Sequence, residues 1–322
     1  MNLRRWLDQP LLDDSFPLPL DAPFTTHDAR QAGLTPRHLT ALVDAALLRR
    51  PVRSVYLASQ AGDSPRLRAA AIRLTVPDGA VVCDRHAGWL HGADMVLAPN
   101  EHLALRPLSV YRLRGMGRLR NDLTAGGERD LRPHDIVELD GLLVTTPLRT
   151  AWDLGRQRFR EDALAGLDQM LRLGVFSTEE LLHGVERFRG HRWITTLREL
   201  APIADARSAS PGESVLRLRW IDLGLPTPQL QVEVWIDGRL VAILDLAHEG
   251  LHYAAEYDGA EWHGSPEQQA HDRVRRAEAA EAGWTIDAFV NADVRGQHRT
   301  VDARLRAGVT AAREAYGRRV FL

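Results

Sequence analysis

Apolar residues recur with helical spacing in some stretches of this chain and alternate as in strands in others, and this pattern divides the chain into three parts. In the first part, two short helices are predicted at residues 25–33 and 35–50, and a strand at 51–59. The proline-rich stretch before them should be loosely ordered. Two helices joined by a glycine turn and followed by a strand predict a winged helix-turn-helix domain over residues 1–62.

The second part, residues 63–205, mixes both patterns. Helices are predicted at 66–74 and 84–91, strand character at 101–146, and helices again through 148–200. The stretch APIADARSASPG that follows is rich in small residues and proline, so we place a domain boundary there. The middle part is therefore expected to be an α+β domain that ends in helices.

The third part, residues 206–322, has a readable order of elements. Its pattern predicts a helix, three strands, a helix, a strand and a final helix, at residues 211–223, 228–236, 239–247, 252–259, 266–282, 284–292 and 298–316. The chain as a whole is thus predicted to be an α+β multidomain protein whose last part has the order αβββαβα.

Three acidic residues stand out on the middle strands of this last part. Asp245 interrupts an apolar run, and Glu256 and Asp258 share one face of the next strand because side chains alternate. If the hairpin closes symmetrically on Gly250 and Leu251, Asp245 lies directly opposite Glu256. Clustered carboxylates repel one another, and a hard divalent cation with oxygen ligands would compensate them. The alternative is a solvent-facing strand with ordinary surface acids.

Neighbouring residues could complete such a site. The carbonyl of Tyr257 is a further candidate metal ligand beside Asp245 and Glu256. Glu213 is either an outer ligand or a first-turn acid favoured by the helix dipole, and His263 could protonate a leaving oxygen. Catalytic candidates are thus Asp245, Glu256, Asp258, His263 and Glu213, and Arg275 and Arg276 are candidates for contact with a phosphate.

The composition excludes some kinds of function and location but does not point to one function. The net charge is −2, so no global excess of positive charge drives nucleic-acid binding. All 41 basic residues are arginine, which removes lysine as a catalytic option. The single Cys83 fits a reducing cytoplasm, and no apolar run approaches the ~20 residues that span a membrane. A cytoplasmic protein is expected.

Arginines of the first part are candidates for binding DNA phosphates. Arg37 lies on the second predicted helix, and Arg49 and Arg50 lie at its end. The alternative is a small helical domain with a solvated arginine face, because helix-turn-helix outlines also occur in proteins that do not bind DNA.

The last third of the chain resembles a known superfamily. The order αβββαβα, with an acid on a middle strand and E-x-D on the next, resembles the PD-(D/E)xK nucleases. The segments AEYDGAEWH and HDRVRRAEAAEAGWTIDAFVNADV resemble more narrowly the branch related to very-short-patch repair endonucleases. The matching positions are Asp245, Glu256, Asp258, Gly259, His263, Asp272, Arg276, Gly283, Trp284 and Asp293.

The chain departs from that pattern at three points. Asp258 stands where the superfamily usually has lysine, and Ala288 stands where this branch commonly has arginine. A zinc site like that of the repair enzymes cannot form with one cysteine. The preceding two-thirds of the chain resembles the winged-helix antitoxins of abortive-infection systems.

These resemblances imply a function with two alternatives. The first is an endonuclease that uses Mg²⁺ or Mn²⁺ to hydrolyse DNA phosphodiester bonds, in phage defence or DNA repair. The second is a non-catalytic DNA-binding transcriptional regulator or antitoxin with a degenerate nuclease fold. DNA is the expected partner in both, membranes are not, and a homodimer and a cognate toxin or defence protein are left open.

Overall fold

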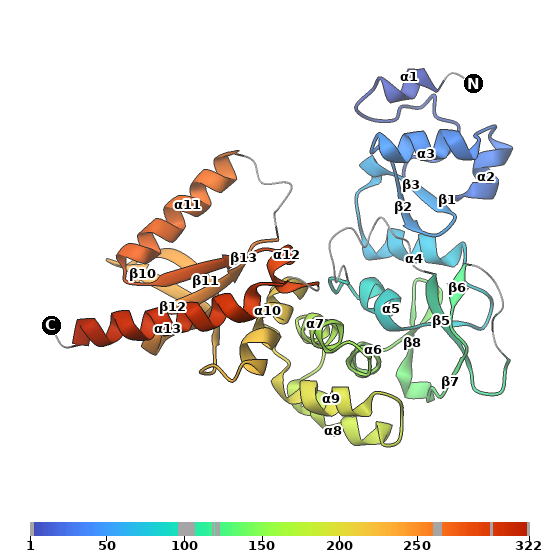
Figure 1. The fold of residues 1–322 in the computed structure, drawn as a ribbon. Helices are drawn as coiled ribbons and strands as arrows, with labels where there is room; N and C mark the ends of the chain where they lie inside the picture. Colours follow the sequence, from blue (N-terminus) through green and yellow to red (C-terminus); the bar gives the residue numbers. More distant parts are fainter. Residues whose placement is uncertain are drawn as a thin grey trace. The chain divides into compact units, whose positions relative to one another are not determined.

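The computed structural model describes residues 3–95, 107–117, 119, 123–259, 266–296 and 299–320, with the backbone alone for 266–272 and 316–320. The chain forms two compact units, one of residues 1–95 and 100–153 and one of residues 96–99 and 154–322. Helices and several sheets are combined (Figure 1), which confirms the α+β class. The two units meet in the sequence at residues 153 and 154, whereas the predicted domain boundaries lie near residues 62 and 205. Within the described residues, no helix is both long and apolar enough to cross a membrane.

The first unit begins with a small helical and antiparallel region. Its sheet has the order β1-β3-β2. Its elements are α1 (Arg4–Leu7), β1 (Phe24–Thr25), α2 (Thr26–Gln31), α3 (Pro36–Asp44), β2 (Leu48–Val52), β3 (Val55–Ala58) and η1 (Ser59–Ala61). The two predicted helices are present, but the second ends at Asp44, and residues 48–50, predicted as its end, belong to β2. Both helices begin at a capping box, formed by Thr25 with Asp28 and by Thr35 with His38.

Two expectations for this region are wrong. The single predicted strand is a hairpin, β2 and β3, whose turn places Ser54 in the left-handed region with φ 63°. The lead-in is not loose: Trp6, Leu12 and Phe16 are buried in the same core as α3. The prolines do prevent a long helix, but the apolar residues between them still gain free energy by packing on the domain.

The remainder of the first unit is built on a sheet of order β6-β5-β4-β9-β8, with β7 also paired to β5. Its elements are α4 (Pro65–Arg73), β4 (Val81–Val82), α5 (Asp84–Leu90), β5 (Leu108–Leu113), β6 (Thr124–Ala125), β7 (Glu128–Arg129), η2 (Pro133–Asp135), β8 (Ile136–Leu139), β9 (Leu142–Thr145) and α6 (Pro147–Gly155). The last residues of α6 belong to the second unit.

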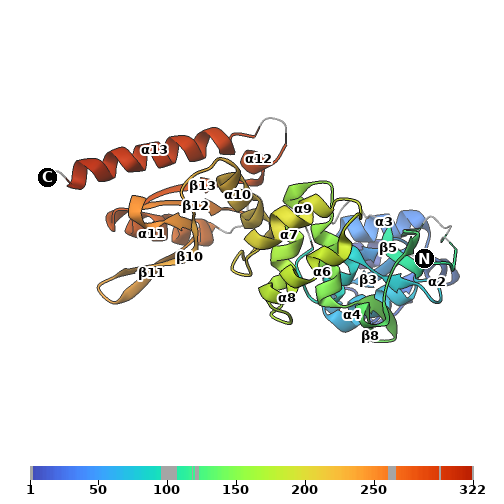
Figure 2. The same ribbon diagram turned by 90° about the horizontal axis from the view of Figure 1, so that it is seen from below.

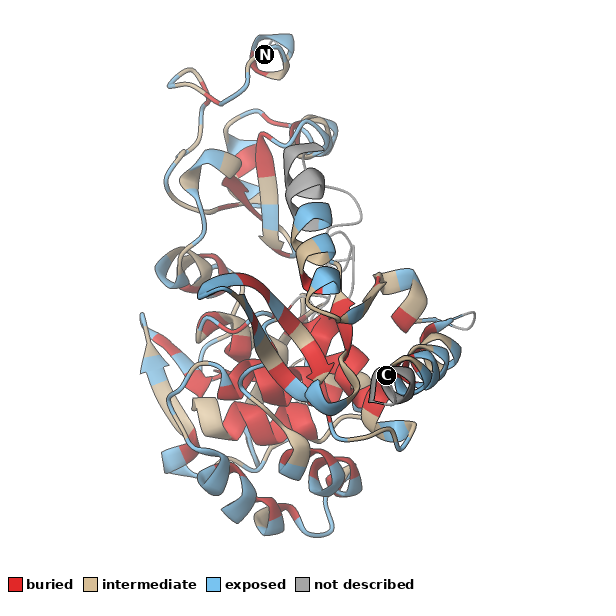
Figure 3. Cartoon of the chain, turned by 90° about the vertical axis from the view of Figure 1, so that its left-hand side faces the viewer, coloured by how far each residue is buried: buried red, intermediate tan, exposed pale blue. Residues whose placement is uncertain are grey.

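The second unit begins with packed helices. These are α7 (Arg160–Leu171), α8 (Thr178–His183), η3 (Val185–Phe188), α9 (Ile194–Leu200) and η4 (Ala201–Ile203). The capping box of Ser177 and Glu180 starts α8 as predicted. Residues 163–171 of α7 are all buried, and buried residues fill the centre of this unit (Figure 3). The helix of residues Pro211–Asp222, α10, packs on α7, and its Arg217 pairs with Asp168 of α7.

The rest of the second unit follows the predicted order, with one short helical turn added between the second and third strands and another before the last helix. Its elements are α10 (Pro211–Asp222), β10 (Gln229–Ile236), β11 (Arg239–His248), η5 (Glu249–Leu251), β12 (Tyr253–Tyr257), α11 (Pro266–Glu281), β13 (Thr285–Phe289), α12 (Asn291–Val294) and α13 (Val301–Val320). Asp237 and Gly238, with φ 49° and 76°, form the predicted turn between β10 and β11.

This four-stranded sheet has the order β10-β11-β12-β13, in which only β12 and β13 run parallel. α11 packs on one face through Ala279, while α10 and α13 cover the other through Trp220 and Leu305 (Figure 1). The β10–β11 hairpin extends beyond the other strands (Figure 2). Two of the predicted acidic residues, Asp245 and Glu256, lie on the neighbouring strands β11 and β12 of this sheet, and a third, Glu213, lies on α10.

Candidate functional site

The register of β11 and β12 places the predicted acids as the hairpin argument expected. Leu246 pairs with Ala255 and His248 with Tyr253. One further step in the same register brings Asp245 opposite Glu256. Directly opposed residues project to the same face of a sheet, so the two carboxylates are neighbours.

Asp245 lies in an environment that disfavours its charge. Burial, followed by the negative charges of Glu213 and Glu256, raises the pKa of Asp245 to about 7, although Arg275 and a hydrogen bond from the Tyr257 amide oppose this. That amide donates to Oδ2 of Asp245 over 2.9 Å. Tyr257 thus contacts Asp245 through its N–H, whereas the prediction assigned a role to its carbonyl as a metal ligand.

Glu256 is held by two arginines of α11. Its side chain is buried, and it accepts from Nη1 and Nη2 of Arg275 over 2.8 and 3.1 Å. Nε of Arg276 donates to Oε2 over 2.8 Å, and Nη2 of Arg276 lies 3.6 Å from Oδ2 of Asp258. The two arginines predicted to contact phosphate therefore contact carboxylates here.

Glu213 joins the same neighbourhood from the first turn of α10. It is 8% exposed, and burial raises its pKa, while a hydrogen bond from the Ala209 amide over 2.8 Å acts against this. Nε2 of Gln231 also lies 3.2 Å from its Oε2. Glu213 is thus a first-turn acid of α10 whose charge acts on Asp245, and its role as an outer metal ligand stays a prediction.

Gln231 is a residue that the sequence did not reveal. It lies between Leu230 and Val232, which pair with Leu246 and Leu244 on either side of Asp245. Its φ of 54° is a left-handed conformation that non-glycine residues rarely adopt. Such strain persists only where surrounding contacts enforce it, and it is often found at functional sites. No pattern in the stretch PQLQVEVWI distinguishes this glutamine from its polar neighbours.

The side chains of Glu213, Asp245 and Glu256 are not arranged as the ligands of a cation. Within the described residues, no three His, Cys, Asp or Glu side chains converge as metal ligands. The oxygens of Glu256 are engaged by guanidinium groups instead of being open to a cation. The predicted Mg²⁺ or Mn²⁺ site stays a prediction, and the present arrangement does not fit it. His263 and the side chain of Asp272 lie outside the described residues.

The arginines predicted to bind DNA in the first unit differ in exposure. Arg37 is exposed on α3, and Arg50 is exposed on β2, where its guanidinium lies 5.4 Å from the ring centroid of Tyr56. Arg49 is partly buried, lies 3.8 Å from Asp63, and has a pKa that burial lowers. Arg37 and Arg50 are therefore better placed than Arg49 to meet a phosphate.

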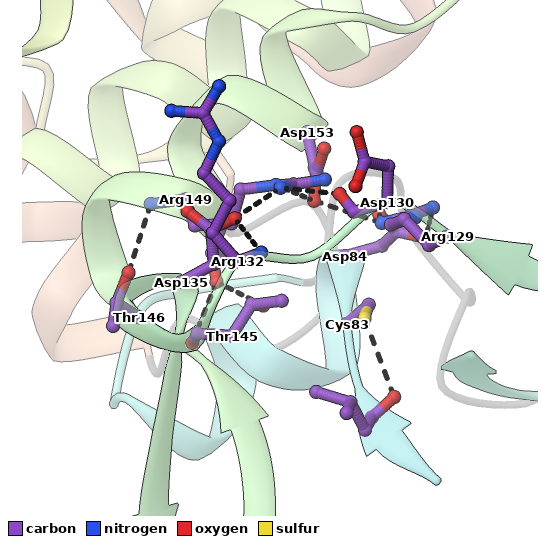
Figure 4. Close-up of polar contacts among 12 residues, drawn as sticks. Cys83, Asp84, Arg129, Asp130, Arg132, Asp135, Thr145, Thr146, Arg149 and Asp153 are labelled. Carbon is purple, nitrogen blue, oxygen red and sulfur yellow. Dashed lines mark hydrogen bonds and ion pairs between the residues drawn. The ribbon is translucent and has the colours of Figure 1, made fainter. Parts of the chain in front are cut away.

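A second charged cluster, in the first unit, was also missed by the sequence analysis. Arg149 donates to Asp135 over 2.8 Å and to Asp153 over 2.9 Å, and all three side chains are buried (Figure 4). Arg129 joins Asp153 over 3.0 Å and Asp84 over 2.6 Å. Only the spacing of Arg149 and Asp153, one helical turn apart, was visible in the sequence. Every charge has a partner, so the cluster fastens α5, α6 and β7 together.

Comparison with known proteins gives a match that includes the residues of this cluster and continues into the second unit. Residues 80–203 match the family model of the AbiEi antitoxin C-terminal domain. The chain is also similar to an uncharacterized protein found in two strains of Mycobacterium tuberculosis, at 40% identity over 180 residues. This similarity spans 56% of the chain and 66% of the length of each relative. The antitoxin-like part of the sequence prediction is thereby supported.

Proposed function

We propose that this chain is a DNA-binding regulator of the antitoxin type. The observation that carries the proposal is the match of residues 80–203 to the AbiEi antitoxin C-terminal domain. A regulator of this type is expected to combine a part that binds DNA with a part that binds a partner protein. A cognate toxin is therefore the expected protein partner, and DNA is the expected nucleic-acid partner.

The DNA-binding module of this proposal lies in the first unit. Leu39 and Leu42 are buried against its core, which turns Arg37 and Thr40 of α3 outward. The β2–β3 hairpin follows in the position of a wing and exposes Arg50. A helix presented beside a hairpin, both with arginines, supports the proposal of a winged helix-turn-helix module in residues 1–62.

Binding of a labelled duplex from the region upstream of the coding sequence, followed by fluorescence anisotropy, tests the proposal. Arg37→Gln and Arg50→Gln should each weaken binding and reduce the slope of log K against log salt by about 1, because each removes about one phosphate contact. Arg189→Gln, an exposed change in the second unit, is the matched control. Equal binding by all four proteins would refute the assignment of these arginines.

The second candidate is a metal-dependent DNA endonuclease. It is supported by the αβββαβα order of the second unit and by the pairing register that sets Asp245 opposite Glu256. The engagement of Glu256 by Arg275 and Arg276 weighs against it. Incubation with plasmid DNA and Mg²⁺ or Mn²⁺, beside Asp245→Ala and Glu256→Ala, separates the candidates, because only the nuclease would cut in a way that these changes abolish.

A further inference from the structure

Positive and negative charges are equal in number where α11 contacts the end of β12. Arg275 and Arg276 bring two positive charges to Glu256 and Asp258, which bring two negative charges. Glu256 is only 3% exposed with the arginines in place, so the guanidinium groups, and not water, compensate its charge. The guanidinium groups thus occupy the role that a bound cation would have in an acidic site.

The geometry leaves no room for both kinds of cation on Glu256. A carboxylate offers about four lone-pair directions, and three N–H groups of the two arginines already point at this one. A hard divalent cation needs those same oxygens at short range. It would also stand next to two positive groups, and like charges at that separation repel.

The position of the arginines is fixed by the packing of α11. Nη1 of Arg275 also lies 3.3 Å from the carbonyl oxygen of Ile243 on β11. Arg239 at the start of β11 pairs with Glu278 of α11 over 2.9 Å, and Ala279 is buried against the sheet. Residues of α11 that follow the two arginines therefore hold the helix in place, so the guanidinium groups cannot swing away without cost.

We infer that Arg275 and Arg276 are the built-in counter-ions of this acidic cluster, and that they take the place of a divalent cation. The free protein does not take up such a cation at Glu213, Asp245 and Glu256. Removal of the two guanidinium groups frees the oxygens of Glu256 beside Asp245, and these two carboxylates then acquire affinity for a divalent cation. The inference concerns the second unit alone and does not depend on DNA binding by the first.

Titration with Mn²⁺, in which free Mn²⁺ is followed by its electron paramagnetic resonance signal, tests the inference. The wild type and the control Arg273→Gln, an exposed residue of the same helix, should leave the free signal unchanged. The double variant Arg275→Gln with Arg276→Gln should bind about one Mn²⁺ per chain. The further change Asp245→Asn in the double variant should abolish that binding.

Two results would overturn the inference. One is stoichiometric Mn²⁺ binding by the wild type that Glu256→Gln removes. The other is a double variant that has the circular dichroism of the wild type but binds no Mn²⁺. If the double variant does not fold, Arg275→Gln alone, which removes two of the three N–H donors from Glu256, is judged by the same two criteria. None of these readouts uses DNA, so the regulator proposal stands or falls separately.

Discussion

Asp245 and Glu256 lie opposite each other on neighbouring strands, yet the surroundings of Glu256 stabilise its negative charge and those of Asp245 disfavour it. Glu256 is compensated by two guanidinium groups. Asp245 accepts a hydrogen bond from the Tyr257 amide, and burial keeps its pKa near 7. The sequence predicted the position of both residues, because strand alternation and a symmetric hairpin fix the register. It could not predict their partners, because α11 is joined to β12 by tertiary packing.

Substitution of Glu256 by Gln should destabilise the second unit. The change keeps the shape of the side chain but leaves Arg275 and Arg276 facing each other without the carboxylate that they share. Breaking a buried pair from one side costs about 3–5 kcal/mol, and partial exposure of the arginines favours the low end of that range. Urea unfolding measures the effect, and Glu281→Gln, exposed at the end of α11, should change stability by less than about 0.5 kcal/mol. Equal stability of both variants would contradict the role given to Glu256.

Protonation of His91 should lower the stability of the first unit in mild acid. Burial lowers its pKa below 6.5, while its Nε2 lies 2.7 Å from the carbonyl oxygen of Thr145. A histidine with a lowered folded-state pKa binds more protons when unfolded, so stability is full above pH 6.5 and falls as the pH drops through and below that value. Melting temperatures at pH 7.5 and 5.5 should differ less for His91→Gln than for the wild type. His183→Gln, exposed on α8, should behave as the wild type.

At the scale of elements, the helices and strands of the last third were predictable and their contacts were not. Apolar periodicity and the Asp-Gly turn predicted the order αβββαβα, to which the structure adds the short elements η5 and α12 within the described residues. In the first part, one predicted strand became a hairpin, because the sequence around Arg53 and Ser54 carries no glycine to mark a turn. Close approaches between elements depend on glycines whose role appears only in three dimensions.

Gly308 of α13 is such a position. A Cβ there would lie 2.5 Å from Oη of Tyr253 and 2.5 Å from Oδ2 of Asp287, which hydrogen-bond to each other over 2.8 Å. Helix propensity alone predicts that Gly308→Ala stabilises by up to about 1 kcal/mol. The steric overlap instead predicts a loss of about 1–3 kcal/mol, measured by thermal or urea unfolding. A stabilised variant would show that α13 does not pack this closely. The exposed change Ala307→Gly reports the ordinary propensity effect on the same helix.

At the scale of the whole molecule, the chain has two compact units where the sequence suggested three parts. The predicted boundary near residue 205 was marked by small residues and proline, but helices on both sides of it are joined. Asp168 of α7 accepts from Arg217 of α10 over 2.6 Å and from the Asp205 amide over 2.8 Å, and both charged side chains are buried. The part of the matched segment that lies in the second unit is thus tied through Asp168 to α10, the helix that carries Glu213.

Loss of this buried pair should therefore affect the whole second unit. Asp168→Ala leaves Arg217 buried without its carboxylate, which costs about 3–5 kcal/mol. Urea unfolding monitored by tryptophan fluorescence, to which buried Trp220 of α10 contributes, should shift together with the loss of helical circular dichroism. A variant in which the tryptophan signal is unchanged would show that α7 and α10 are not one folding unit. Asp222→Ala, on the exposed pair with Arg160, is the matched control and should have a small effect.

The most direct test of the account is a single titration in which binding and cleavage of the upstream duplex are followed together, with Mg²⁺ and then with a chelator. The account predicts that the wild type binds the duplex with the same affinity in both conditions and leaves it uncut. Cleavage that requires Mg²⁺ and disappears in Asp245→Ala would contradict it.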